Sequence, residues 1–145
     1  MPKQKFFPVA AQGDKYKFSA YIRKSRGYPG VYIVKGKKGG PVYIGHSTYN
    51  VYKMLTRHFH AWPDDTQKRV TYKNRGAYRV RIVLTKTGAQ ALRLERALIV
   101  KYKPRDNPDK LEKFMNVEQM GKAEKKALDT YLSDDVLSPT DNIPF

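Results

Sequence analysis

The chain has 145 residues, a length that fits one domain with one modest hydrophobic core. It carries 29 Lys and Arg residues against 13 Asp and Glu residues, and the net charge of +16 predicts a polyanionic partner such as DNA. No apolar run is long enough for a membrane span or a signal peptide, and the absence of cysteine excludes disulfides and thiolate zinc sites, which indicates a cytoplasmic protein.

The sequence predicts three regions. Residues 1–28 form a basic lead-in with scattered aromatic residues, and we expect one strand within it over residues 16–23. Residues 29–120 form the main domain. Residues 121–145 are expected to form a helix followed by an acidic tail, because residues 127–145 contain four aspartates and neither Lys nor Arg.

Two similar segments follow the lead-in, in the stretch GVYIVKGKKGGPVYIGHS at residues 30–47. Apolar residues occupy alternate positions in each segment, which predicts two half-buried strands joined by a glycine-rich turn. If Lys37 and Lys38 are the central turn residues, Tyr32 lies directly opposite Tyr43. A bulge at Gly39 makes the two tyrosines a diagonal pair instead.

Further along the chain, apolar residues recur first at helical and then at strand spacing. Thr87 and Gln90 have the spacing of a capping box, which marks the start of a second helix, and Pro104 ends it. The predicted elements are a helix over residues 50–59, a short strand over 69–74, a strand over 77–86 and a helix from 87 to about 102.

Glu95 is an acidic residue within the second predicted helix. It shares a helical face with Ala91 and Ile99, so its carboxylate is expected near the edge of the core. The alternative is an ion pair with Arg96 or Lys101 on a solvated face.

Two triplets and a later helix together carry a family resemblance. The chain has GVY at residues 30–32, YIG at residues 43–45 and LERALIVKYKPRDN at residues 94–107. In this order and spacing they resemble the GIY-YIG nuclease family over residues 30–107. The resemblance implies an α+β fold, a small central antiparallel three-stranded sheet flanked by helices.

The same resemblance implies metal-dependent hydrolysis of a DNA phosphodiester. Glu95 would hold one divalent cation, and Mg²⁺ is expected because a hard cation prefers carboxylate and water oxygens. Tyr43 or Tyr32 would help to take the proton from the attacking water. Gly45 and Asn107 would support the site.

The first predicted helix departs from the family pattern. The position of the family's helix arginine falls on Lys53, or on Met54 if one residue is inserted. We favour Arg57, one turn later, because its planar fork binds two phosphate oxygens, with Lys53 as the alternative. His58 is expected to donate or shuttle a proton. Two histidines rank lower, His46 and His60.

Four cationic residues are further candidates for contacts with the DNA backbone. They are Lys37, Lys38, Arg79 and Arg81.

The last residues, DNIPF, resemble the terminal peptide of bacterial single-stranded DNA-binding proteins. This resemblance implies a partner among replication or repair proteins that recognise that tip, with Ile143, Pro144 and Phe145 as the contact residues. The alternative is a disordered acidic extension.

The sequence therefore favours a metal-dependent DNA endonuclease from a mobile element or phage. The alternatives are a DNA-binding or adaptor protein that keeps the fold with weak or no catalysis, and a basic RNA-binding protein. Met54 in the first helix favours the adaptor, whereas the set Tyr32, Tyr43, Glu95 and Asn107 favours the nuclease.

Overall fold

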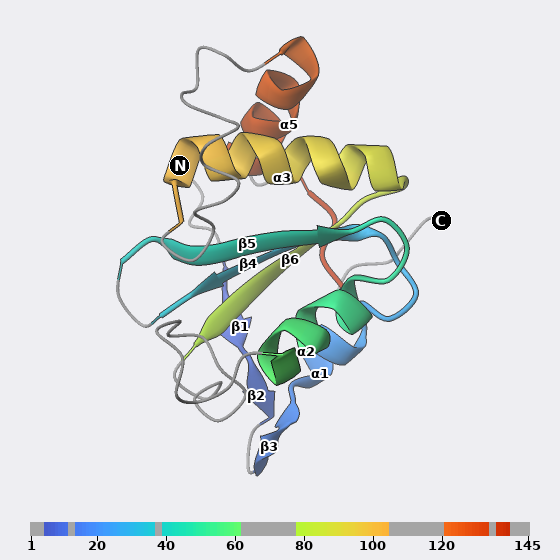
Figure 1. The fold of residues 1–145 in the computed structure, drawn as a ribbon, viewed down its shortest axis with the longest axis vertical. Helices are drawn as coiled ribbons and strands as arrows, with labels where there is room; N and C mark the ends of the chain where they lie inside the picture. Colours follow the sequence, from blue (N-terminus) through green and yellow to red (C-terminus); the bar gives the residue numbers. More distant parts are fainter. Residues whose placement is uncertain are drawn as a thin grey trace.

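The computed structural model describes residues 5–11, 14–36, 39–61, 78–104, 121–133 and 136–139, and it leaves the side chains of residues 14–17 and 58–61 undescribed. Its elements form one central sheet with helices on both faces (Figure 1). Of the helices in these ranges, none has both the length and the apolar composition needed to cross a membrane.

The central sheet has four antiparallel strands in the order β1-β6-β4-β5. Three of them were predicted, whereas β1 is an addition from the lead-in, so the expectation of three strands was wrong by one. With only two residues, β1 is too short to leave a periodic pattern in the sequence. The strands are β1 (Phe7–Pro8), β4 (Gly30–Lys35), β5 (Pro41–Ser47) and β6 (Arg79–Leu84).

The lead-in also completes the sheet beside β1. The hydroxyl of Tyr21 accepts a hydrogen bond from the backbone N–H of Ile82 at 2.7 Å and donates one to the carbonyl oxygen of the same residue at 3.2 Å. The Tyr21 ring stacks on Phe7, with 4.0 Å between the ring centroids. A side chain thus satisfies backbone groups of β6 that a longer β1 would otherwise pair.

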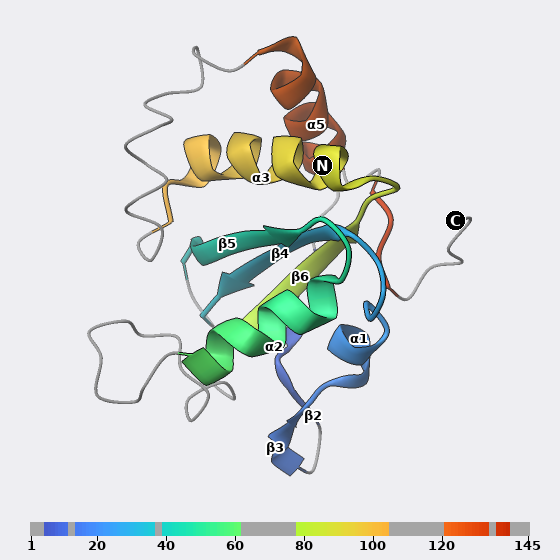
Figure 2. The ribbon, with the colours of Figure 1, turned by 45° about the vertical axis from the view of Figure 1, so that its right-hand side comes forward.

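Helices cover both faces of this sheet. In Figures 1 and 2, α3 and α5 lie on one side of it and α1 and α2 on the other. The expected strand over residues 16–23 is correct only in its first half, because the chain turns into α1 after Phe18. The remaining elements are β2 (Ala10–Ala11), β3 (Asp14–Phe18), α1 (Ala20–Arg23), α2 (Val51–Ala61), α3 (Gly88–Tyr102) and α5 (Lys122–Leu132).

The boundaries of α3 are those that the sequence predicts. The Thr87 hydroxyl accepts from the backbone N–H of Gln90 at 3.2 Å, and the Gln90 side chain accepts from the backbone N–H of Thr87, which completes the capping box. The helix ends at Tyr102, where Lys103 takes a left-handed conformation, φ 47°, immediately before Pro104.

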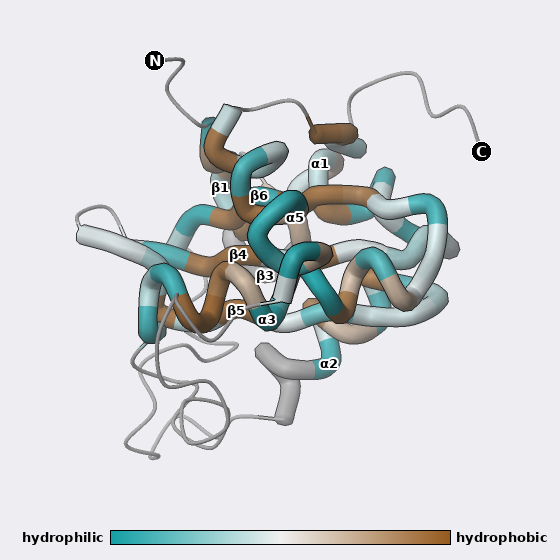
Figure 3. The backbone as a smooth tube through the Cα atoms, turned by 90° about the horizontal axis from the view of Figure 1, so that it is seen from above, coloured by the Kyte–Doolittle hydropathy of each residue, from teal (hydrophilic) through white to brown (hydrophobic). Residues whose placement is uncertain are grey.

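Two hydrophobic cores lie on opposite faces of the sheet. Tyr32 and Tyr43 belong to the core on the α1 and α2 side, whereas Val31, Ile33 and Ile44 belong to the core under α3 and α5. Both β4 and β6 are therefore buried on both faces, whereas β4 was predicted to be half-buried. Figure 3 shows hydrophobic stretches along the central strands and alternating hydrophobic and hydrophilic segments in α3.

Candidate active site

The two tyrosines of the triplets lie on neighbouring strands as a diagonal pair. Tyr32 is opposite Gly45 and Tyr43 is opposite Val34, with a register shift where the pairing continues to Lys35. Their rings stack, with 6.0 Å between the centroids and 28° between the planes. This is the diagonal alternative of the sequence analysis, and both side chains point to the same face of the sheet.

Gly45 leaves the space that the Tyr32 ring occupies. A Cβ atom at residue 45 would come within 3.0 Å of three atoms of that ring, Cζ, Cε2 and the hydroxyl oxygen. Tyr32 therefore extends across β5, which is the edge strand of the sheet. Gly30 has an analogous role in the first triplet, since a Cβ there would meet the carbonyl oxygen of Val83 on β6 at 2.5 Å.

The environment of Tyr32 keeps its phenol protonated. The side chain is 1% exposed, and this burial raises the pKa of Tyr32 well above its ordinary value. Tyr43 and the Glu95 carboxylate nearby raise the pKa of Tyr32 further. A phenol in this position donates a hydrogen bond more readily than it accepts a proton from water.

Glu95 projects from α3, which packs on β5, and is 3% exposed. The prediction of a carboxylate near the core is confirmed, and the alternative of a solvated face is wrong. One of its carboxylate oxygens, Oε2, forms a hydrogen bond with Nδ1 of His46 on β5. His46 was ranked low in the sequence analysis, although its position offered a signal. It lies two residues after Ile44, so it is directed to the α3 face of the sheet, where Glu95 also lies.

The helix α2 carries the cations that were considered as phosphate ligands. Asn50 caps it, with Oδ1 accepting from the backbone N–H of Lys53 at 3.3 Å. Lys53 and Arg57 are both exposed, one turn apart, whereas Met54 is half-buried and packs against the core. Arg57 and Lys53 are thus accessible to a ligand, and Met54 has a packing role.

The sequence of residues 28–108 matches the family of UvrC-like GIY-YIG domains, and this segment is more than half of the chain. The chain belongs to the GIY-YIG family. Its architecture is therefore a nuclease fold, the one that the two triplets indicated.

Solved structures of a GIY-YIG domain are similar to this chain. One is the N-terminal endonuclease domain of UvrC from Thermotoga maritima bound to its catalytic divalent cation, magnesium. It is 29% identical, covers 62% of this chain and 99% of its own, and has a TM-score of 0.47. A point mutant of the same domain, also bound to its catalytic divalent cation, is 30% identical, covers 62% and 98%, and has a TM-score of 0.45. No curated protein matches the chain.

Within the GIY-YIG domain, the two arginines of β6 have different surroundings. Arg79 is exposed at the start of the strand. Arg81 is 6% exposed, donates from Nη1 to the carbonyl oxygen of Lys5 at 3.1 Å, and lies over the Tyr131 ring of α5, 5.4 Å from its centroid. Because α5 and the lead-in cover its guanidinium, this geometry does not support the prediction that Arg81 contacts DNA.

The donor atoms near Glu95 limit which cation this GIY-YIG domain can hold. Among the described residues, no group of three or more His, Cys, Asp or Glu side chains is placed to bind a metal. The site offers one buried carboxylate and one imidazole. Such a donor set fits a cation that keeps several water ligands, as Mg²⁺ does, and does not form an all-protein cage.

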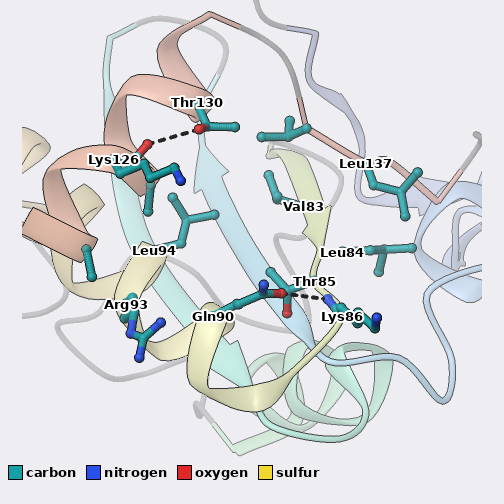
Figure 4. Close-up of a pocket in the computed structure, with 13 residues that line it drawn as sticks. Val83, Leu84, Thr85, Lys86, Gln90, Arg93, Leu94, Lys126, Thr130 and Leu137 are labelled. Carbon is teal, nitrogen blue, oxygen red and sulfur yellow. Dashed lines mark hydrogen bonds between the residues drawn. The ribbon is translucent and has the colours of Figure 1, made fainter. Parts of the chain in front are cut away.

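A separate pocket of about 470 Å³ lies between α3, α5 and the end of β6. Figure 4 shows two of its polar side chains bonded to nearby backbone groups: Gln90 Oε1 accepts from the Lys86 N–H at 3.0 Å, and the Thr130 hydroxyl donates to the Lys126 carbonyl oxygen at 2.9 Å. Neither the tyrosine pair nor Glu95 lines it. The pocket is therefore distinct from the candidate active site.

Several predictions fall outside the described residues and stay predictions. They concern Lys37, Lys38, Asn107, the strand over 69–74, the side chains of His58 and His60, and the tip formed by Ile143, Pro144 and Phe145. The family match ends at residue 108, so it gives no support to the resemblance of that tip to single-stranded DNA-binding proteins.

Proposed function

We propose that this chain is a metal-dependent DNA endonuclease that hydrolyses phosphodiester bonds. The observation that carries the proposal is the buried carboxylate of Glu95, bonded to His46 and close enough to Tyr32 to raise the pKa of its phenol. A buried carboxylate is costly to maintain unless it is paired or binds a cation, and this one acts electrostatically on Tyr32 of a nuclease fold.

Glu95 would hold the divalent cation, with Mg²⁺ as the first candidate. When bound, this cation supplies positive charge that stabilises the charge developing on the phosphate and the leaving oxygen. The role of Glu95 is to bind this cation beside β5, where α3 fixes the backbone of Glu95.

The two tyrosines would have different roles. Because the pKa of Tyr32 is raised, its buried phenol stays protonated and acts as a hydrogen-bond donor, not as a base. We therefore assign acceptance of the proton from the attacking water to Tyr43.

DNA is the proposed substrate because the chain has a net charge of +16 and exposes cations on α2 and at the start of β6. Arg57 would bind a phosphate through its planar fork, and Lys53 lies one turn earlier on the same face of α2. Arg79, at the start of β6, would contact the DNA backbone at another phosphate.

The test is nicking of supercoiled plasmid DNA by the full chain with Mg²⁺, compared with excess chelator and with Glu95→Gln. We expect the neutral amide to reduce cleavage by about 10³-fold, since the cation's contribution is several kcal/mol at the transition state. DNA binding by Glu95→Gln should stay close to that of the unchanged chain, because the exposed cations are retained. Cleavage by Glu95→Gln at the unchanged rate would exclude this site as the origin of the activity.

The second candidate is a DNA-binding or adaptor protein with weak or no catalysis. The observation that favours it is Met54, which packs against the core at one of the two positions open to the family's helix arginine. Salt-dependent DNA binding without metal-dependent nicking would support this candidate.

A further inference from the structure

The bond between His46 and Glu95 joins two structural layers at the candidate metal site. Glu95 belongs to α3, and His46 belongs to the edge strand β5 beneath it. The carboxylate is almost fully buried, whereas the His46 side chain is 23% exposed. The histidine therefore lies between the buried carboxylate and solvent.

A carboxylate that binds a metal must be held in one orientation. Rotation about the last side-chain bond of glutamate has a broad energy well, so the backbone position of Glu95 does not by itself fix the directions of its oxygens. When Nδ1 of His46 carries the proton, its hydrogen bond to Oε2 restricts this rotation and so favours one direction for each carboxylate oxygen. Partners of this kind around metal ligands tune metal affinity.

The contact is made by the δ nitrogen of His46, on the face of the sheet opposite the tyrosines. His46 directly follows Gly45, the residue over which Tyr32 lies, and successive strand residues point to opposite faces. The Tyr32 ring and the His46 imidazole thus approach the β5 edge from opposite faces of the sheet. Glu95 contacts His46 and also raises the pKa of Tyr32, so it is electrostatically linked to both faces.

We propose that His46 is a positioning residue for Glu95, one that orients the carboxylate for the divalent cation through its Nδ1–H group. This inference rests on the proposed metal site, and it adds a residue outside the set that the sequence analysis favoured. The competing explanation is that the His46 bond only holds α3 on β5, with no effect on the cation.

A matched pair of variants separates these explanations. In His46→Asn the side-chain amide nitrogen occupies roughly the place of Nδ1, whereas in His46→Gln it occupies roughly the place of Nε2. Both variants keep an uncharged N–H donor, so they differ mainly in where that donor lies. His46→Ala removes the donor, and Glu95→Gln removes the ligand charge.

The readout is Mn²⁺ binding by the folded full-length chain at constant pH, measured by electron paramagnetic resonance of the free ion, without DNA. We expect His46→Ala and His46→Gln to weaken binding by about 10- to 100-fold and His46→Asn to restore most of it. Thermal unfolding of each variant shows whether a loss of binding reflects a loss of folding.

The outcomes for the two residues are distinguishable. If Glu95→Gln loses Mn²⁺ binding while His46→Ala and His46→Gln bind as the unchanged chain does, the positioning role is excluded and the metal site stands. If Asn and Gln at residue 46 are equally impaired in binding although both are folded, the proposed δ-nitrogen contact is excluded. If Glu95→Gln binds Mn²⁺ as the unchanged chain does, the metal site itself is wrong.

Discussion

The ring of Tyr32 lies over Gly45 on the neighbouring strand, in a space that any side chain at residue 45 would fill. The tyrosine of the first triplet can thus take this position only because the second triplet has a glycine there. Because of this close fit, a buried phenol from β4 extends over β5, and the Glu95 charge raises the pKa of that phenol. The glycine is therefore needed for the position of the tyrosine, and not for a turn.

We predict that Gly45→Ala reduces cleavage and destabilises the fold by about 1–3 kcal/mol, the usual cost of overpacking a core. The added methyl would meet Cζ, Cε2 and the hydroxyl oxygen of Tyr32, so the ring must shift. In a Tyr32→Leu background these ring atoms are absent, and the same substitution should cost clearly less. Urea unfolding of the four proteins in this cycle measures the coupling. Equal costs in both backgrounds would show that the clash lies with the strand itself.

The raised pKa of Tyr32 predicts a specific loss of stability at high pH. Below about pH 10 the phenol is protonated in both the folded and the unfolded chain and contributes no pH dependence. Above that value the unfolded chain loses the proton while the folded chain keeps it, so the free energy of unfolding falls as pH rises toward the folded pKa. The slope from this one group approaches about 1.4 kcal/mol per pH unit.

Tyr32→Phe removes this contribution, so its free energy of unfolding should fall less steeply between about pH 10 and about pH 11. Urea unfolding of both proteins over that range checks it, because every other ionisable side chain is the same in the two proteins. Parallel curves would contradict a raised pKa for Tyr32.

For α2, we predict that Arg57→Ala lowers the cleavage rate by about 10²-fold or more, the cost of losing an oriented donor at the transition state. Lys53→Ala should lower it less, because an ammonium binds as a point charge without the planar fork. Both side chains are exposed, so neither change should affect folding. Single-turnover cleavage separates this effect from DNA affinity, and the reverse order of the two variants would assign the role to Lys53.

Much of the fold could be predicted from local patterns. Strand alternation located β4, β5 and β6, and the capping box at Thr87 with Pro104 located α3, because each depends on residues close together in the sequence. The four-strand sheet could not be predicted, since β1 has two residues and pairs with a strand more than 70 positions later. The hydroxyl of Tyr21, which substitutes for strand pairing at Ile82, is likewise a long-range contact.

The candidate site was predictable only in part, for a similar reason. The tyrosines and Glu95 belong to motifs, whereas His46 gains its importance from contact with a residue 49 positions away. The diagonal arrangement of Tyr32 and Tyr43 depended on a register shift near Lys35 that the sequence left open. Arg81 alternates with apolar residues like a solvated side chain, but α5 covers that face.

The two arginines of β6 offer a last test, because they have the same side chain on the same strand and differ in burial. Arg79 is exposed, whereas Arg81 is buried against Tyr131 and donates to the Lys5 carbonyl oxygen. Arg81→Ala should reduce the free energy of unfolding by about 1–3 kcal/mol, since it removes a buried side chain together with its hydrogen bond to Lys5 and its contact with the Tyr131 ring.

Arg79→Ala should change stability by no more than about 0.5 kcal/mol, and it should weaken DNA binding while lowering the salt dependence by about one counterion. Urea unfolding and fluorescence anisotropy at several salt concentrations measure the two effects on each variant. At concentrations of salt where both variants are folded, Arg81→Ala should keep the salt dependence of the unchanged chain. A lowered salt dependence in Arg81→Ala would mean that its guanidinium leaves Tyr131 to contact DNA, and that α5 moves when DNA binds.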